Sequence, residues 1–220
     1  MRRLLLLRPE PGLSASAERA RAQGLEVIAA PLFRVEPVAW AVPDLSAYDA
    51  LLFTSANAVL NGGDGHGALT HLPVHAVGAA TAEAARAAGF TVASVGEGGV
   101  EALLNSLPAE LKLLHLAGHH RHAVAANHRV DVRTVYRAVA IADPALPPLD
   151  GLVIAVHSRR AGARLADVAG PHPSAAIAAI SADAGGACGP GWGSVDIAAA
   201  PDDASLLALA ARLCQISSPR

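Results

Sequence analysis

The stretch ALLFTSAN at residues 50–57 has its pattern repeated by LVIAVHSRR at residues 152–160, because each is a short apolar run that ends in a polar turn. The repeat keeps a fixed register along each half of the chain. Three residue pairs stand 103 positions apart: Ser55 and Ser158, Gly78 and Ser181, and Leu103 and Leu206. Each half is therefore expected to run strand, turn, helix, strand, turn, helix, strand and helix. Such a duplication predicts two similar α/β lobes with function at the polar ends of their strands.

The expected fold class is α/β, with two similar lobes of parallel sheet flanked by helices and joined by a two-stranded β connector. Leu4–Leu7 is a continuous apolar run, typical of a parallel strand buried on both faces. The extended stretches 32–38 and 130–139 are separated by about one lobe's length and are expected to pair as the connector. The expected domains are a discontinuous first lobe of residues 1–35 plus 138–220, an inserted second lobe of residues 40–131, and connector strands at 36–39 and 132–137.

Glycine and proline mark the expected loops. Gly62–Gly67 lacks the Lys-Ser/Thr of a phosphate-binding loop, so we expect a flexible surface loop there. Pro171–Pro173 and Gly185–Gly191 are also expected to be loops. The second of these interrupts the helix that should correspond to Ala79–Ala88, so that helix is expected to be short or distorted.

The composition excludes several classes of function. Hydrophobic residues make up 52% of the 220 residues but aromatic residues only 3%, which argues against an aromatic platform for nucleic acid. The net charge of −2 gives no basic field for polyanions, so no nucleic-acid partner is expected. Lys112 is the one lysine of the sequence, which nearly excludes a Schiff-base or phosphate-loop lysine.

The cysteines and the N-terminus predict the compartment. Cys188 and Cys214 have no metal-type spacing and suggest no disulfide framework, which is typical of a reducing compartment. The first apolar run is cut by Arg8 and Pro9 and is too short for a signal peptide or a membrane span. We expect a cytoplasmic, soluble chain with no membrane partner. A monomer is expected because the alanine-rich helices carry no strong interface signal.

The first polar turn holds Thr54, Ser55 and Asn57 directly after an apolar run. Hydroxyl and amide groups that precede a helix N-terminus suit an anion such as a carboxylate. Helix capping is the alternative role for these residues, and the two roles can coexist.

The second polar turn, with Gly78, Ala79 and Thr81, also precedes a helix. It lacks the third glycine and the downstream acidic residue of a dinucleotide fingerprint, so it gives only weak support for NAD binding. It does offer backbone N–H groups at the start of a helix. In the duplicate of the first turn, Ser158 and Arg159 supply a hydroxyl and a guanidinium that suit carboxylates, although arginines at helix starts also commonly face solvent.

Five histidines crowd one segment: His115, His119, His120, His122 and His128. No carboxylate or thiolate is interleaved to complete a coordination set, so no metal and no other cofactor is expected. The alternative is a polar, partly cationic edge at a strand-to-helix turn of residues 116–118, which would suit an anionic ligand.

Tyr136 lies in the expected connector and is one of two tyrosines. Its phenol can donate a proton or hydrogen bond to a leaving hydroxyl. The alternative is a tyrosine that fills a site between strands.

The ordered set of stretches along this chain resembles uroporphyrinogen-III synthase. The matching pieces are LLLLRP at 4–9, YDALLFTS at 48–55, VGAATA at 77–82, VYR at 135–137, and the turns at 158 and 180–181. They span nearly the whole chain, and their order rather than any single motif carries the resemblance. It implies two lobes of parallel sheet joined by a β-ladder, with the substrate bound between them.

The resemblance also implies a reaction: cofactor-free cyclisation of hydroxymethylbilane to uroporphyrinogen III, with loss of water and inversion of ring D. A transient contact with hydroxymethylbilane synthase is expected. By motif match, Tyr136 is the acid that assists departure of hydroxide, and Ser55, Thr81 and Ser158 bind the bilane. Further substrate-binding candidates in the matching turns are Arg8, Thr54, Asn57, Gly78, Ala79, Gly118, His157, Arg159 and Ser181.

Three positions depart from the family pattern. Asp183 stands where several relatives carry a hydroxyl and would repel a carboxylate, Ala117 replaces a usual arginine, and His157 replaces a common threonine. These departures lend support to an alternative, a non-catalytic two-lobed binding or sensor protein. A third interpretation, an unrelated doubly wound enzyme that uses a nucleotide, is disfavoured by the missing glycine fingerprint.

Overall fold

A computed structural model describes residues 1–120 and 129–215. The chain forms two compact units, Met1–Arg34 with Ala140–Arg220 (unit 1) and Val35–Val139 (unit 2). Both are α/β structures with mostly parallel sheets, as the continuous apolar runs of the sequence predict.

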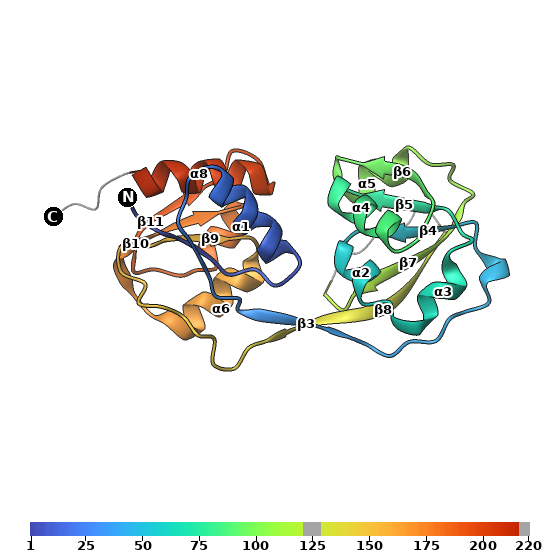
Figure 1. Ribbon diagram of the computed structural model, residues 1–220, viewed down its shortest axis with the longest axis horizontal. Coiled ribbons are helices and arrows are strands. Elements are labelled where there is room, and N and C mark those ends of the chain that lie inside the picture. The colour runs from blue at the N-terminus through green and yellow to red at the C-terminus, as the bar shows by residue number, and fades with distance from the viewer. Residues whose placement is uncertain (121–128, 216–220) are drawn as a thin grey trace. The chain divides into compact units, whose positions relative to one another are not determined.

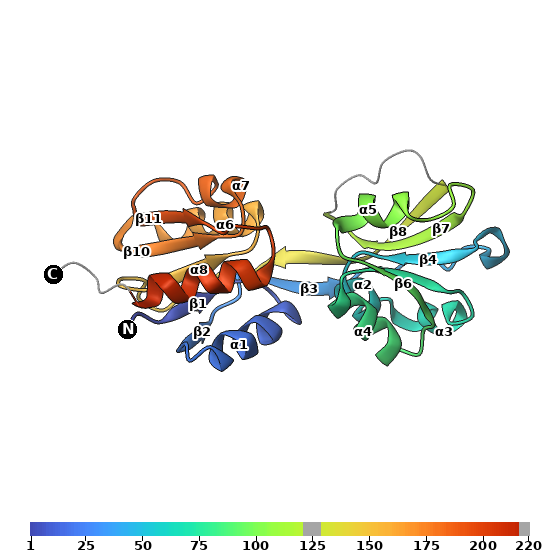
Figure 2. The same cartoon turned by 90° about the horizontal axis from the view of Figure 1, so that it is seen from above.

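Unit 1 is built on a five-stranded sheet in which every neighbouring pair is parallel. Its order is β11-β10-β9-β1-β2 (Figures 1 and 2). The strands are β1 (Leu4–Leu6), β2 (Val27–Ala29), β9 (Val153–Val156), β10 (His172–Ala179) and β11 (Trp192–Ile197). The side chains of β1 and β9 are completely buried. Strands this apolar must be covered on both faces.

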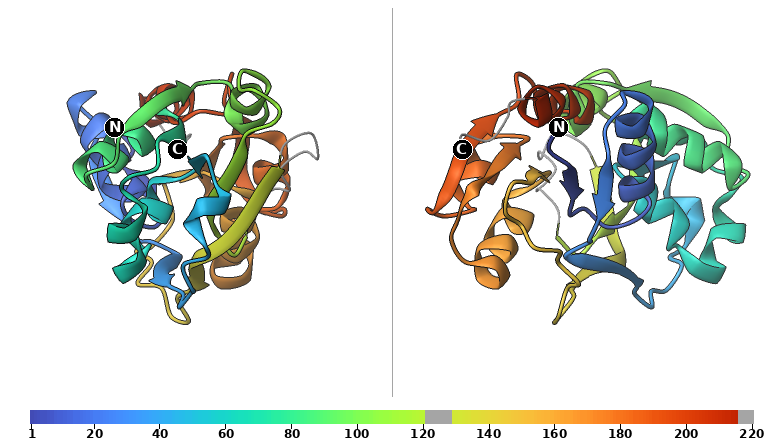
Figure 3. Two further views of the ribbon diagram at one scale, coloured as in Figure 1. Left: turned by 90° about the vertical axis from the view of Figure 1, so that its right-hand side faces the viewer. Right: turned by 60° about the vertical axis from the view of Figure 1, so that its left-hand side comes forward.

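Helices cover both faces of this sheet. The helices are α1 (Gly12–Ala22), α6 (Arg159–Ala169), α7 (Ala182–Gly186) and α8 (Asp203–Gln215). Helices α1 and α8 share one core with Leu4 and Leu6, while α6 and α7 contact each other on the opposite face (Figures 1 and 2). The chain start lies beside α8, where the backbone N–H of Arg2 donates to the carbonyl of Cys214 at 2.8 Å (Figure 3).

Unit 2 has a six-stranded sheet in the order β3-β8-β7-β4-β5-β6. The strands are β3 (Phe33–Pro37), β4 (Ala50–Phe53), β5 (Val74–Val77), β6 (Val92–Gly96), β7 (Lys112–Gly118) and β8 (Arg129–Ala140). The helices are η1 (Leu45–Ala47), α2 (Ala56–Leu60), η2 (Gly63–Gly65), α3 (His66–Leu69), α4 (Ala79–Ala87) and α5 (Gly99–Asn105). Helices α2, α3 and α4 cover one face of the sheet and α5 covers the other (Figure 2).

The two sheets repeat each other. Without β3, the order β6-β5-β4-β7-β8 of unit 2 matches β11-β10-β9-β1-β2 of unit 1. Leu103 of α5 and Leu206 of α8, which are 103 residues apart, are both buried in the cores of their units. In each unit the chain leaves the sheet centre in opposite directions, so a topological switch point lies between β1 and β9 and another between β4 and β7.

The chain crosses from unit 1 to unit 2 within β3 and returns within β8, which are neighbours in one sheet. Inside unit 2, the N–H of Val38 donates to Val135 at 2.8 Å, and Glu36 pairs with Arg137 at 3.0 Å. The expected connector strand at 132–137 lies within β8, whereas the one expected at 36–39 begins in β3 but runs past its end at Pro37.

Several local expectations were wrong. The segment Gly62–Gly67 is not a loop, because residues 63–67 belong to η2 and α3. The ring of His66 packs against Phe53 and Phe90 and anchors the segment. Pro173 lies inside β10, which tolerates it because its register with β11 is irregular between His172 and Ala176.

Other local expectations differ less from the structure. Residues 116–118 are the last residues of β7 rather than a turn. Helix α7 has only five residues, against nine in α4, so the short helix expected at the Gly185–Gly191 interruption is confirmed.

The domain boundaries expected from the sequence, 1–35 plus 138–220 and 40–131, stay a prediction as units of folding. We expect residues 1–34 joined to 140–215 by a short glycine-containing linker to fold by themselves, because the N–H of Ile141 already donates to Leu32 at 2.9 Å. Circular dichroism should show a cooperative thermal transition, measured beside that of the full chain. A chain without such a transition would contradict the prediction.

Candidate functional site

In unit 1, polar side chains gather at the carboxyl ends of the two central strands. Arg8 follows β1 and His157 follows β9, one on each side of the switch point. Ligands of open α/β sheets bind at such points, because the strand ends leave a crevice there. This edge of unit 1 is therefore its candidate binding site.

Asp203, the first residue of α8, connects these groups. Its Oδ1 atom accepts hydrogen bonds from Ser16 Oγ at 2.6 Å, His157 Nε2 at 2.8 Å and Arg8 Nη1 at 3.0 Å. Its Oδ2 atom accepts from Arg19 at 2.7 and 3.0 Å. The carboxylate thus joins the N-terminal region, which supplies Arg8, Ser16 and Arg19, to His157 after β9 and to α8.

The protonation states follow from this geometry. Burial alone would raise the pKa of Asp203, but hydrogen bonds from His157, Ser16 and Arg19 hold that pKa well below its ordinary value. Burial lowers the pKa of His157, against the opposing effect of Asp203. The site therefore holds an ionised carboxylate and a largely neutral imidazole at neutral pH, with Nε2 as the donor to Asp203.

The two helix starts beside this cluster are capped by serine. Ser158 and Ser181 accept the N–H groups of Ala161 and Ala184, each at 3.2 Å. Capping occupies a lone pair of each oxygen, while the hydroxyl proton can still be donated to a ligand. Asp183 is exposed and lies 3.5 Å from Arg159, so its negative charge at this edge is partly balanced.

In unit 2, the first polar turn lies beside the switch point. Thr54 Oγ1 lies 3.0 Å from Nε2 of the buried His115 in β7, a hydrogen-bond distance. Ser55 caps α2 by accepting the N–H of Asn57 at 3.2 Å. The capping role proposed for this turn is confirmed, and Thr54, Ser55 and Asn57 all keep partly exposed surface.

Tyr136 lies on β8 opposite Gly118, at the carboxyl end of β7. A Cβ atom on Gly118 would come within 2.7 Å of the Tyr136 ring and 2.9 Å of the phenol oxygen. The glycine therefore makes room for the ring, which is only partly buried. This contact brings together two residues that the sequence named separately.

The residues of the second polar turn differ in their accessibility to a ligand. Gly78 adopts a φ of 81°, which only glycine reaches without strain, and precedes α4. Ala79 is exposed at the helix start, where backbone N–H groups lack helical partners. Thr81, in contrast, is only 5% exposed and is the least accessible of the predicted substrate-binding hydroxyls.

Sequence reasoning missed three members of the unit 1 cluster, Ser16, Arg19 and Asp203. Asp203 is the first residue of α8, and its counterpart 103 positions earlier in the repeat is the apolar Val100. The repeat therefore does not indicate a polar role for Asp203. The one sequence signal is an acidic pair, Asp202 and Asp203, placed just before the last apolar helix.

The histidine segment is only partly described. His122 and His128 lie outside the described residues, whereas His115 is buried in β7 and His119 and His120 are exposed. Within residues 1–120 and 129–215, no three His, Cys, Asp or Glu side chains are placed to hold a metal ion. Among the same residues, no helix is long and apolar enough to cross a membrane.

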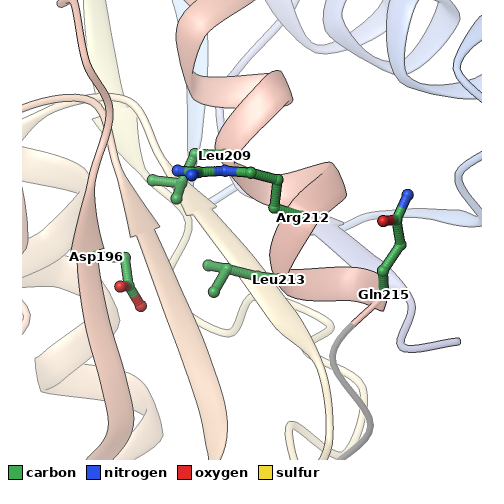
Figure 4. Close-up of a pocket in the computed structure, with 5 residues that line it drawn as sticks. All are labelled: Asp196, Leu209, Arg212, Leu213 and Gln215. Carbon is green, nitrogen blue, oxygen red and sulfur yellow. The ribbon is translucent and has the colours of Figure 1, made fainter.

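Two hollows lie away from these strand ends. One of about 380 Å³ lies between β11 and the second half of α8, lined by Asp196, Leu209, Arg212, Leu213 and Gln215 (Figure 4). Another of about 310 Å³ in unit 2 is bordered by Trp40 and the glycine segment, and Trp40 donates to the carbonyl of Gly62 at 2.8 Å. Neither hollow is lined by a residue of the predicted site.

Comparison with known proteins now gives the family. The sequence profile described as Uroporphyrinogen-III synthase HemD matches residues 14–207. Uroporphyrinogen-III synthetase from Helicobacter pylori 26695 superposes with a TM-score of 0.68 at 18% identity, over 97% of this chain and 100% of that one. A mutant uroporphyrinogen III synthase from the extremely thermophilic bacterium Thermus thermophilus gives 0.52 at 20% identity, over 98% and 99%. No protein of curated function matched in sequence.

The fold is thus that of a two-unit α/β protein with mostly parallel sheets and polar groups at their switch points. The chain belongs to the uroporphyrinogen-III synthase family, whose members are lyases of tetrapyrrole biosynthesis. The expected fold class and the interpretation as this synthase are confirmed. No comparison favours a non-catalytic binding or sensor protein.

Stability should fall on acidification. Burial lowers the pKa of His66, His75 and His157, so each binds fewer protons in the folded than in the unfolded state. The contribution of these histidines to the free energy of unfolding is lost as the pH falls below about 6.5, the ordinary histidine pKa. We expect a lower Tm at pH 5.5 than at pH 7.5 and a smaller difference in His75→Asn, whereas exposed His71→Gln should behave as wild type. Equal Tm values at both pH values would contradict this.

Proposed function

We propose that this chain converts hydroxymethylbilane to uroporphyrinogen III. The linear tetrapyrrole loses its hydroxyl as water, ring D is inverted, and a carbon–carbon bond closes the macrocycle. The family match over residues 14–207 carries the proposal. The polar strand ends of both units support it, because their hydroxyls, guanidiniums and backbone N–H groups suit a substrate with eight carboxylates.

Binding and folding of the bilane is the main contribution of these groups. The bilane loses its hydroxyl and closes spontaneously without inversion, so the enzyme must hold it in the geometry that leads to the inverted product. Serine hydroxyls at helix starts, such as Ser55 and Ser158, donate to carboxylates while they cap. The exposed N–H groups at Ala79 add donors without charge.

Tyr136 assists the departure of the hydroxyl. Its phenol donates a proton to the leaving oxygen, so that water rather than hydroxide departs. The proton that the closing ring releases, when the last pyrrole becomes aromatic again, restores the phenol. No other group is required to balance the reaction.

The proposal extends to the oligomeric state, the compartment and the partner of the enzyme. The enzyme acts as a monomer in the cytoplasm and takes its unstable substrate from hydroxymethylbilane synthase by transient contact. It uses no cofactor.

The decisive assay supplies freshly made hydroxymethylbilane, oxidises the products and separates isomers I and III by chromatography. Isomer III should dominate without an added cofactor. Isomer I alone, formed at the spontaneous rate, would reject the proposed function.

Tyr136→Phe should lower kcat by less than about tenfold and leave KM nearly unchanged, because spontaneous loss of water partly replaces acid assistance. Tyr48→Phe is the matched control, since the Tyr48 hydroxyl donates to Asp131 at 2.8 Å and takes no part in the proposed chemistry. Unchanged turnover in Tyr136→Phe would remove Tyr136 from the mechanism without removing the function.

Gly118→Ala should lower turnover at least as much as Tyr136→Phe, because the added methyl would meet the ring at 2.7 Å and displace the phenol. Gly67→Ala, where a Cβ meets nothing within 4 Å, controls for the loss of a glycine. Rates of isomer III formation by both variants check this. Wild-type turnover in Gly118→Ala would show that the position of the Tyr136 ring is not critical.

A further inference from the structure

The Asp203 carboxylate is fully used by the protein itself. Five hydrogen bonds from Arg8, Ser16, Arg19 and His157 end on its two oxygens, and the side chain is only 18% exposed. A carboxylate saturated in this way is poorly suited to bind a ligand. Its effect on a ligand must come through the groups that it holds.

Among the groups that Asp203 holds in place, Arg8 has hydrogen-bond donors beyond those that contact the carboxylate. Its side-chain hydrogen bonds within the described part of the chain, to Asp203 at 3.0 Å and Ser16 at 2.9 Å, are both made by Nη1. Its Nε and Nη2 atoms lie over Gly12, where a Cβ would come within 2.4 and 2.5 Å of them. The side chain keeps 29% of its surface exposed. One edge of the guanidinium is thus fixed by the protein, and the Nε–Nη2 edge is the fork that suits a carboxylate.

We propose that Asp203 is a positioning residue, which fixes the guanidinium of Arg8 so that its Nε–Nη2 edge receives one carboxylate of the substrate. This inference rests on the proposed function, because the substrate supplies the carboxylate. Ser16 has a supporting role, since its hydroxyl accepts from Arg8 and donates to Asp203. The position at the end of β1, beside the switch point, gives a ligand access to this edge.

Charge alone predicts the opposite effect of removing Asp203. Arg8 and Arg19 each carry a positive charge beside this carboxylate, so neutralising it would make the site more positive. A more positive site attracts a polyanionic substrate more strongly. If Asp203 acts through geometry instead, its removal frees the Arg8 side chain and weakens binding. The direction of the change in KM separates the two explanations.

The test compares Asp203→Asn with Asp202→Asn. Both variants remove one negative charge at the same end of α8. Asp202, however, caps the helix by accepting the N–H of Ser205 at 2.7 Å, whereas the carboxylate that accepts from Arg8 is that of Asp203. We expect KM for hydroxymethylbilane to rise roughly tenfold in Asp203→Asn, with kcat changed less than about twofold, and KM near the wild-type value in Asp202→Asn. A KM that is unchanged or lowered in Asp203→Asn would overturn the proposal.

A double-mutant cycle with Arg8→Ala shows whether Asp203 acts through Arg8. The proposal expects Asp203→Asn to add little to the KM of Arg8→Ala, because the group it positions is already absent. A merely structural role would lower the Tm of Asp203→Asn, and its effect on KM would persist in the Arg8→Ala background. Additive effects on KM would therefore reject the positioning role.

Ser16→Ala decides the question if Asp203→Asn does not fold. This variant keeps all charges and removes one hydroxyl from the cluster, and it should raise KM by a smaller factor in the same direction. Wild-type KM in Ser16→Ala would then count against the proposal. Wild-type formation of isomer III is measured first, so that a failure of the proposed function is recognised separately from a failure of this inference.

Discussion

Burial of the central strands on both faces is the constraint on which the rest of the structure depends. The side chains of β1, β4 and β9 are all essentially inaccessible to solvent, as are most of those on β7. Sheets covered in this way leave little room for polar groups along the strands. Because the central strands of each sheet are parallel, their carboxyl ends lie at one edge of that sheet, and in each unit the predicted substrate-binding side chains are concentrated where these strands end.

The two units carry different residues at the equivalent edges of their sheets. Thr54 after β4 corresponds to His157 after β9, and strand register places Ala117 of β7 where Arg8 follows β1. Unit 1 thus has an ionic cluster at its switch point, whereas unit 2 has the hydrogen-bonded pair of Thr54 and His115. The duplication therefore preserved the sheet and let the chemistry of its two edges diverge.

The fold could be predicted from the sequence because apolar runs and a constant spacing are local signals. Ser55, Ser158 and Ser181 could be named as candidates for the same reason, since each stands two residues after the end of an apolar strand. Asp203 could not be found, because its partners come from three other segments and meet only after α1 and α8 pack on the same face. The glycine segment at 62–67 was misjudged because the contacts of His66 with two phenylalanines leave no trace in its local composition.

The cluster around Asp203 also constrains how the sequence can drift. Loss of the carboxylate alone would leave the positive charges of Arg8 and Arg19 at a partly buried position without the negative charge that pairs with both. Loss of either arginine would leave a desolvated carboxylate with fewer donors. We therefore expect covariation among positions 8, 16, 19, 157 and 203. Relatives should retain or replace these residues together, although they span nearly the whole chain.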